Sequence, residues 1–149
     1  MKAVYLDNSQ ATKPSEKAVA EMLPFYSEYW GNPLAPHKKG QELTASLKKS
    51  YKAVYELLGA SEKDTLVFTS SGAEAVNHAA LSCYLNTTLQ TGKNHFITTA
   101  CAEAPHLMAV NRLEEMGCVG TKVALNSSGV LTKEALGDVI TPRTALLSL

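Results

Sequence analysis

The chain has 149 residues, of which 45% are apolar and 19% charged, a composition typical of a globular domain long enough to bury a core. Fourteen basic and fourteen acidic side chains give a formal net charge of zero, so the basic excess of nucleic-acid-binding or membrane-surface proteins is missing. We therefore expect the partners to be small molecules or other proteins, with no nucleic acid and no membrane.

The start of the chain and its cysteines give a first prediction of compartment. The apolar stretch Ala3–Leu6 is too short for a secretory signal, and no apolar run approaches the length of a membrane span. The cysteines are widely spaced and form no C-x-x-C pattern, which predicts neither a disulfide framework nor a metal site. We expect a cytoplasmic protein with three buried or half-buried thiols, Cys83, Cys101 and Cys118.

The first part of the chain is predicted to be mainly helical. Ala3–Leu6 predicts a brief strand, and the polar residues 7–14 predict a turn. Apolar residues at helical spacing from Ser15 to Trp30 predict an amphipathic helix that ends before Pro33. A second long helix is predicted from about Gly40 to Leu58.

Beyond residue 59, strand and helix patterns alternate. The expected strands are Thr65–Thr69, His95–Thr99, Gly120–Leu125 and Thr144–Leu149, and the expected helices are Gly72–Leu89, Pro105–Met116 and Thr132–Ile140. Strands joined by helical crossovers pair in parallel, which predicts an α/β fold with helices on both faces of the sheet. Ligands in such sheets bind beyond the carboxyl ends of the strands, so the turn after Thr69 and the loop after Thr99 are the candidate site.

The turn from Ser71 to Glu74 has the features of an anion-binding helix start. Its small residues allow close approach to the backbone, and the first amides of a helix have no intrahelical acceptor and lie at the positive end of the helix dipole. A plain strand-to-helix turn with a serine N-cap explains the same residues. The stretch has neither a Walker lysine nor a G-x-G-x-x-G motif, either of which would favour the anion site.

The last predicted strand, Thr144–Leu149, has no helix or polar tail after it. A doubly wound sheet that stops there leaves apolar strand edges for another segment to cover. We therefore expect a truncated chain or half of a split one, with poor solubility or a tendency to oligomerise.

Several motifs together resemble the cysteine desulfurases of the NifS/IscS type, which are class V, fold-type I enzymes that use pyridoxal 5′-phosphate. The resembling residues are Val4–Ser9, Ala11–Pro14, Gly31–Pro33 with His37, Val67–Ser70 with Glu74 and Asn77, Gly92–His95, Glu103–Pro105, Leu113–Gly117 and Thr141–Leu146. The resemblance extends over essentially the whole chain. It implies the N-terminal, incomplete part of a fold-type I large domain, residues 15–149, preceded by a strand and loop, residues 1–14, that belong with the small domain.

The resemblance also implies a site for the cofactor. Family members hold its phosphate through backbone amides and a threonine hydroxyl, whereas the matching residue here is Ala73. A lost charge-assisted hydrogen bond of this kind is worth about 1.5–3 kcal/mol, enough to weaken binding without abolishing it. The residues expected to contact the cofactor are Ser71, Gly72, Ala73, Glu74, Asn77 and Ala104.

A second departure concerns the catalytic histidine. In the family an acidic residue is followed by a histidine that stacks on the pyridine ring and moves protons; here Glu103 is followed by Ala104. His106 is the candidate replacement, but a helical residue two positions further on points about 200° away. It could take over the role only if the loop were rebuilt.

The implied reaction converts L-cysteine, or a similar amino acid, to L-alanine and delivers enzyme-bound persulfide sulfur for iron–sulfur clusters or thiolation. The implied partners are a second copy of the chain and a sulfur acceptor or scaffold protein. In the family, the Schiff-base lysine, the carboxylate on the pyridine nitrogen and the sulfur-accepting cysteine lie beyond the point where this sequence stops, so we expect no activity from the chain alone. A non-catalytic remnant or interaction module, and another class V enzyme such as an aminotransferase or selenocysteine lyase, remain open alternatives.

Overall fold

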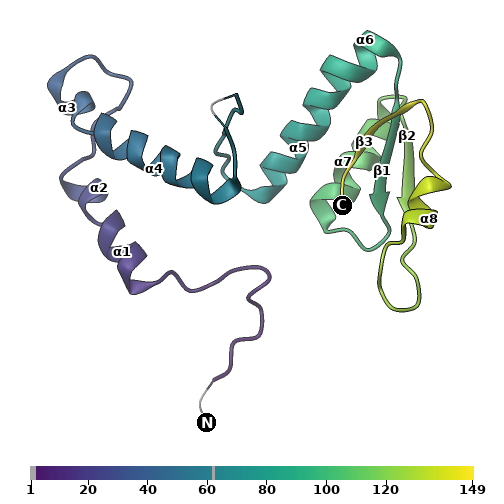
Figure 1. Cartoon of the computed structure of the whole chain (residues 1–149), viewed down its shortest axis with the longest axis horizontal. Helices are drawn as coiled ribbons and strands as arrows, with labels where there is room; N and C mark the ends of the chain where they lie inside the picture. The colour runs from purple at the N-terminus through teal and green to yellow at the C-terminus, as the bar shows by residue number, and fades with distance from the viewer. Residues whose placement is uncertain (1–2, 62) are drawn as a thin grey trace. The chain divides into compact units, whose positions relative to one another are not determined.

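The computed structural model describes residues 3–61 and 63–149. The chain forms two compact units, one that extends to Leu66 and one from Val67 to Leu149. The positions of the two units relative to one another are not determined (Figure 1).

The first unit is helical. Its helices are α1 (Glu16–Met22), α2 (Pro24–Ser27), α3 (Lys38–Gln41) and α4 (Thr44–Leu58). The single helix predicted up to Trp30 is wrong, because Pro24 has no backbone N–H to donate and instead begins a new helix after Leu23. The second predicted helix is confirmed in its main part, α4, which ends at Gly59 in the left-handed conformation that glycine favours.

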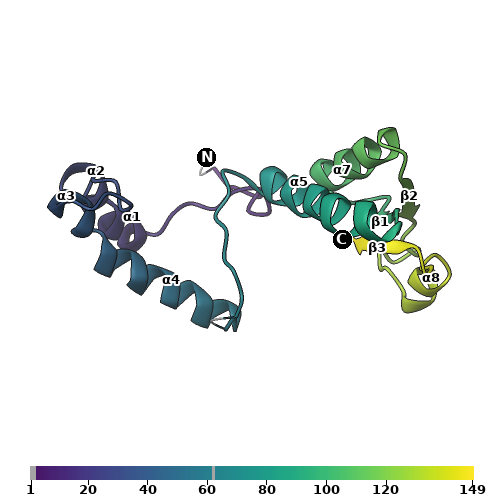
Figure 2. The same cartoon turned by 90° about the horizontal axis from the view of Figure 1, so that it is seen from above.

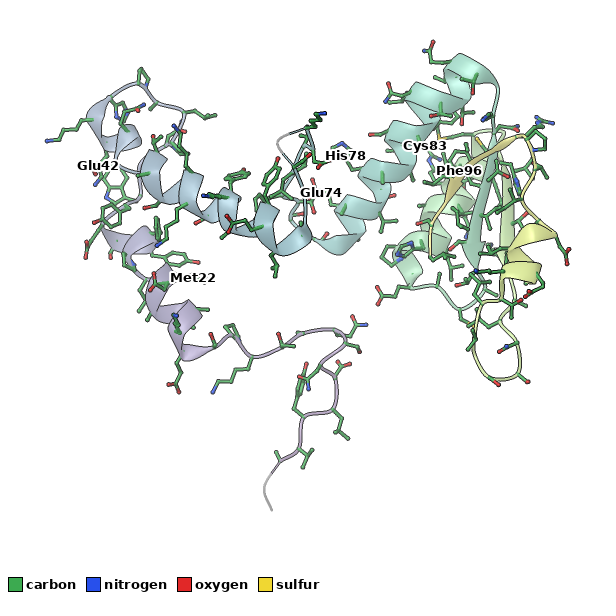
Figure 3. The ribbon with its side chains drawn as sticks, viewed as in Figure 1. Met22, Glu42, Glu74, His78, Cys83 and Phe96 are labelled. Carbon is green, nitrogen blue, oxygen red and sulfur yellow. The ribbon has the colours of Figure 1, made fainter. Side chains whose placement is uncertain are left out.

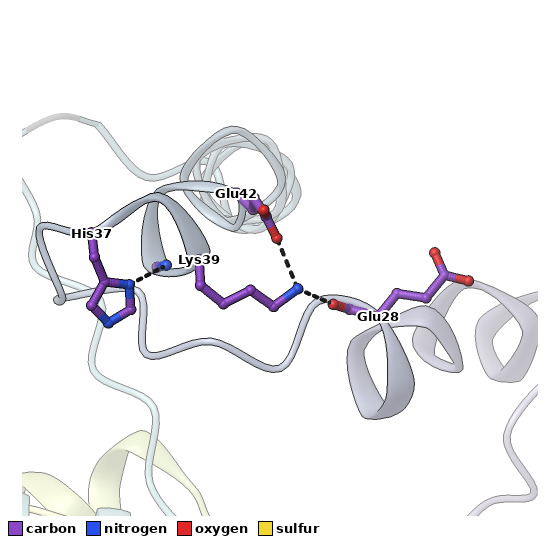
Figure 4. Close-up of polar contacts among 5 residues, drawn as sticks. Glu28, His37, Lys39 and Glu42 are labelled. Carbon is purple, nitrogen blue, oxygen red and sulfur yellow. Dashed lines mark hydrogen bonds and ion pairs between the residues drawn. The ribbon is translucent and has the colours of Figure 1, made fainter.

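Lys39 ties the connection between α2 and α3 together (Figure 4). Its Nζ donates to the backbone carbonyl of Glu28 at 2.6 Å and to the Glu42 carboxylate at 2.9 Å. The same ammonium lies 5.4 Å from the ring centroid of Trp30, within cation–π range. One side chain therefore links the end of α2 to the start of the next helical segment.

Gly40 is required where this connection folds back on itself. A Cβ atom at Gly40 would clash with the carbonyl oxygens of Asn32 and Ala35. His37 caps α3 at the same place, its Nδ1 accepting from the Gly40 amide at 3.3 Å. His37 is thus an exposed residue with a structural role as the N-cap of this short helix.

The second unit is α/β. Its elements are α5 (Gly72–Cys83), the π-helical turn η1 (Tyr84–Thr88), α6 (Leu89–Thr91), β1 (His95–Thr99), α7 (Ala104–Glu115), β2 (Val119–Val123), α8 (Lys133–Gly137) and β3 (Thr144–Leu147). The strand order is β2-β1-β3, and both pairings are parallel, which confirms the predicted sheet type. Figure 2 shows α5 and α7 on one side of the sheet and α8 on the other.

The core of this unit lies between the central strand and the two long helices. Phe96 of β1 packs with Ala80 of α5 and with Ala109, Val110 and Leu113 of α7. Phe96 and Leu113 are almost completely buried, at 1% and 2% exposure. All five residues of β1 are buried, as expected for the middle strand of a parallel sheet covered on both faces.

His95 joins the three strands at the start of β1. It is buried, and its Nδ1 and Nε2 each lie 2.9 Å from a threonine hydroxyl, those of Thr144 and Thr121. Thr144 belongs to β3 and Thr121 to β2, so each neighbouring strand contributes one hydroxyl to the hydrogen bonds of His95.

Two predicted strands are wrong. In the described residues, neither Ala3–Leu6 nor Thr65–Thr69 belongs to a strand, although β propensity is high in both stretches. A strand exists only where its backbone groups pair with another, and Val67 and Phe68 remain more than half exposed. The thiol prediction is also wrong for Cys101, which is exposed, whereas Cys83 and Cys118 are half-buried.

Candidate functional site

The candidate site is built around the first turn of α5. Ser71 is the N-cap, with extended backbone angles of φ −162° and ψ 162°, and its hydroxyl accepts from the Glu74 amide at 3.2 Å. Because α5 leads through η1 and α6 to the start of β1, its C-terminal end lies at the amino edge of the sheet. Its first turn therefore points toward the carboxyl edge, where ligands of such sheets bind.

Two amides of this turn remain available. The serine cap satisfies Glu74 N–H, whereas the amides of Gly72 and Ala73 have no acceptor within the described residues. A Cβ atom at Gly72 would meet nothing within 4 Å, so the space beside its Cα is open. The donor set, two free amides at the positive end of a 12-residue helix, fits a phosphate dianion.

The carboxylate of Glu74 turns back on the chain before the helix (Figure 3). It accepts from both the amide and the hydroxyl of Ser70 at 2.6 Å. These hydrogen bonds, first that of the hydroxyl and then that of the amide, lower the pKa of Glu74 from its ordinary value. Glu74 thus stays ionised beside the corner and stabilises the turn through Ser70.

Asn77 lies one turn further along α5, and its exposed side-chain amide donates to the Ala73 carbonyl at 2.9 Å. The interaction is internal to the helix. Of the predicted cofactor-contacting residues, Ser71, Gly72, Ala73, Glu74 and Asn77 are brought together here by sequence proximity alone.

The other two predicted site residues lie at the start of α7. Ala104 is the first helical residue and is exposed, and His106 follows it by two positions. The Nδ1 atom of His106 lies 2.7 Å from the Ser148 hydroxyl, just after β3, and the ring is half-buried. The imidazole is therefore engaged with Ser148. In the described residues, the loop before α7 does not have the rebuilt conformation that a catalytic role of His106 would require.

Sequence reasoning missed two residues of this region. Ser70 could have been found, because Ser71 and Glu74 form the S-x-x-E pattern in which a third-position glutamate bonds back to an amide before the helix. Ser148 had no such signal, since its partner His106 is 42 residues away.

Comparisons with known proteins identify the family of the chain. A family model described as Aminotransferase class-V matches residues 4–149. The chain therefore belongs to the class-V aminotransferase family.

The relatives narrow the family further. The chain is 34% identical over its whole length to a protein named cysteine desulfurase from Nostoc sp., and 32% identical over 99% of its length to cysteine desulfurase NifS of Azotobacter vinelandii. A solved structure named NifS-like protein superposes with a TM-score of 0.85 at 28% identity, with 94% of this chain and 37% of that chain covered. The chain spans 36% of the length of the two curated relatives.

The described residues contain neither a candidate membrane span nor a candidate metal centre. No helix of residues 3–61 and 63–149 is both long and apolar enough to cross a bilayer. The same residues contain no group of three or more histidine, cysteine or acidic side chains that could hold a metal ion.

Proposed function

We propose that the chain is the N-terminal part of a pyridoxal 5′-phosphate-dependent cysteine desulfurase. In the proposed reaction the C–S bond of L-cysteine breaks and an enzyme thiol takes the sulfur, so that a thiol and cysteine yield a persulfide and L-alanine. The match over residues 4–149 and the cysteine desulfurase relatives support this assignment. The persulfide sulfur would serve iron–sulfur cluster assembly or thiolation.

The observation that carries the proposal is the pair of free amides at Gly72 and Ala73. They would donate to the cofactor phosphate, while Ser71 caps the helix and Glu74 holds the preceding residue in place. When bound, the cofactor supplies an electron sink for the amino-acid substrate. Ala73 contributes no hydroxyl, so the phosphate would rest on backbone donors, which every substitution except proline leaves in place.

The rest of the assembly is proposed from the relatives. We assign residues 1–14 to the small domain and residues 15–149 to the large domain. The Schiff-base lysine and the sulfur-accepting cysteine come from polypeptide outside these 149 residues, so the chain by itself is not expected to turn over cysteine. A homodimer in the cytoplasm, with a sulfur acceptor or scaffold protein as its partner, completes the proposal.

One observation favours a second candidate, a non-catalytic desulfurase-like module. Ala73 and Ala104 stand where the resemblance implies a threonine and a histidine, and His106 is bonded to Ser148. Such a module would retain the anion corner and lose the proton-transfer group. An engineered Ala104→His in the intact desulfurase would raise turnover of cysteine under the first proposal and would leave a non-catalytic module inactive.

A donor deletion tests the corner directly. Gly72→Pro removes one amide hydrogen at the first helical position, where proline fits, and Ser71 already has the extended conformation that precedes proline. The matched control is Lys133→Pro, the same position of α8 after a threonine cap. With pyridoxal 5′-phosphate and inorganic phosphate as probes, nuclear magnetic resonance of the 15N-labelled chain should show shifts at Ala73 and Gly72.

Gly72→Pro should weaken the binding of both probes about tenfold, the worth of one charge-assisted hydrogen bond, and Lys133→Pro should leave it unchanged. Corner amides that do not respond to either probe in the wild-type chain would overturn the proposal.

A further inference from the structure

Four elements of the second unit meet around one small cavity. A small apolar cavity of about 10 Å³ is lined by residues of α5, α7, β1 and the end of β3. His106 and Ser148 are its only polar lining residues among those described, and Val76, one turn along α5 from Gly72, lines it as well. The cavity thus places the His106–Ser148 pair beside the helix that carries the free amides.

The pair is held firmly on the strand side. The Ser148 amide donates to the Ile97 carbonyl at 2.9 Å, which continues the β3–β1 pairing past Leu147. Ser148 is therefore fixed to the central strand, and its hydroxyl lies 2.7 Å from His106 in the first turn of α7. One side-chain hydrogen bond thus fastens the start of α7 to the sheet.

The position of the His106 imidazole does not allow it to stack on a ligand. It lines an apolar cavity with almost no free volume, with Phe96, Ala109 and Val110 around it, so it is packed toward the core of the unit. Ala104, two positions earlier, lies at the exposed start of the helix, about 200° around it. His106 is therefore placed to hold α7 and not to stack on a ligand beyond Ala104.

We propose that His106 is a positioning residue: its hydrogen bond to Ser148 sets the first turn of α7 against β3 and, through the shared cavity with Val76, the phosphate corner of α5. This inference deepens the proposed function and rests on it. The Gly72 and Ala73 amides keep their direction toward the ligand only while α5, α7 and β3 stay packed around this pair.

The test removes either end of the bond. Ser148→Ala and His106→Leu both delete it, whereas His106→Asn keeps a polar atom at the Nδ1 position and should restore it. The control is Asn111→Ala, which deletes another 2.7 Å hydrogen bond of α7, that from Lys122 of β2. Circular dichroism and thermal unfolding verify that each variant folds.

Two readouts separate the claims. In the chain without ligand, Ser148→Ala and His106→Leu should shift the Gly72 and Ala73 amide resonances. With inorganic phosphate they should also raise the dissociation constant about three- to tenfold, the range of one neutral hydrogen bond. His106→Asn and Asn111→Ala should leave both readouts near the wild-type values.

Each result decides one claim. If the wild-type chain binds phosphate and neither deletion moves the corner amides or the affinity, the positioning role is overturned and the proposed function stands. If the corner amides respond to both deletions while the wild-type chain binds no phosphate, the proposed function fails and the mechanical link from His106 to the corner stands. Equal effects of Asn111→Ala would also overturn the link, because they would show a general loosening of α7.

Discussion

The Glu74 carboxylate is 2.6 Å from both the backbone nitrogen and the hydroxyl of Ser70, so one acidic side chain fastens the residue that precedes the N-cap of α5. Both hydrogen bonds favour the ionised carboxylate and lower its pKa. The corner proposed to receive a phosphate is therefore stabilised by a carboxylate placed on the chain side of the turn.

The first prediction concerns acid. Because the pKa of Glu74 is lower in the folded chain than in the unfolded one, its stabilisation is present above the unfolded value of about 4.3 and is lost as the pH falls through the folded value. Glu74→Gln should therefore be less stable than wild type at pH 7, with the difference closing in acid. Urea unfolding between pH 7 and pH 3 measures it.

The control for this prediction is Glu134→Gln, in the first turn of α8, whose carboxylate has no hydrogen bond within the described residues. It tests the helix-dipole contribution alone. An equal pH-dependent difference in both variants would show that the Ser70 contacts contribute nothing.

The second prediction restores the missing hydroxyl. Ala73→Thr adds a donor beside the two free amides, and one charge-assisted hydrogen bond at an exposed site should improve phosphate affinity about tenfold. Ala79→Thr, exposed on the same helix, has the same propensity cost and should leave affinity unchanged. Isothermal titration with pyridoxal 5′-phosphate compares the two; tighter binding in both, or in neither, would contradict the assigned role of residue 73.

The third prediction concerns lysine. No lysine of the chain has a recognisable Schiff-base context, so pyridoxal 5′-phosphate followed by borohydride reduction should leave only scattered, substoichiometric adducts. Peptide mass spectrometry locates them. A single stoichiometric adduct at one lysine would show that the reactive amine belongs to this chain after all.

The fourth prediction concerns the first unit. Gly40→Ala places a Cβ against the carbonyl oxygens of Asn32 and Ala35, both backbone atoms that cannot rotate away. Overpacking of this kind costs about 1–3 kcal/mol, so the unfolding midpoint of this unit should fall. Gly137→Ala, where an added Cβ meets nothing within 4 Å, is the control and should be neutral or slightly stabilising. Equal stability of the two variants would mean that the connection repacks freely.

The fifth prediction concerns association. β3 is an edge strand of the described sheet, and Leu147 and Leu149 are 37% and 60% exposed. Such an edge promotes pairing between chains, so the chain should self-associate and Leu147→Lys should reduce this. Sedimentation velocity gives the distribution of species; a wild-type monomer at all concentrations would refute the expectation.

Much of the second unit could be predicted from the sequence, because its signals are local. The run His95–Thr99 between polar segments indicated a buried strand, and Pro105 and Gly117 bracketed the helix that became α7. The N-cap at Ser71 could likewise be predicted from the serine before the helix. In each case the residues that decide the structure are neighbours along the chain.

The failures have a different origin. Val67 and Phe68 have the β propensity of a strand, but propensity alone does not place a segment in a sheet. Pro24 is a known helix breaker, but the apolar periodicity continues across it, and the prediction of one long helix followed the periodicity. The bond between His106 and Ser148 depends on how α7 and β3 pack, so only the folded chain reveals it.

Parallel strands have no hairpin to fix how far one slides along the next, and a slip by one residue would turn every side chain of the slipped strand to the opposite face. His95, with a threonine hydroxyl on each flank, meets both hydroxyls in one alignment of the three strands. A single imidazole thereby fixes the register of all three strands. The positions of the loops at the carboxyl edge, including the loop after β1, depend on that register.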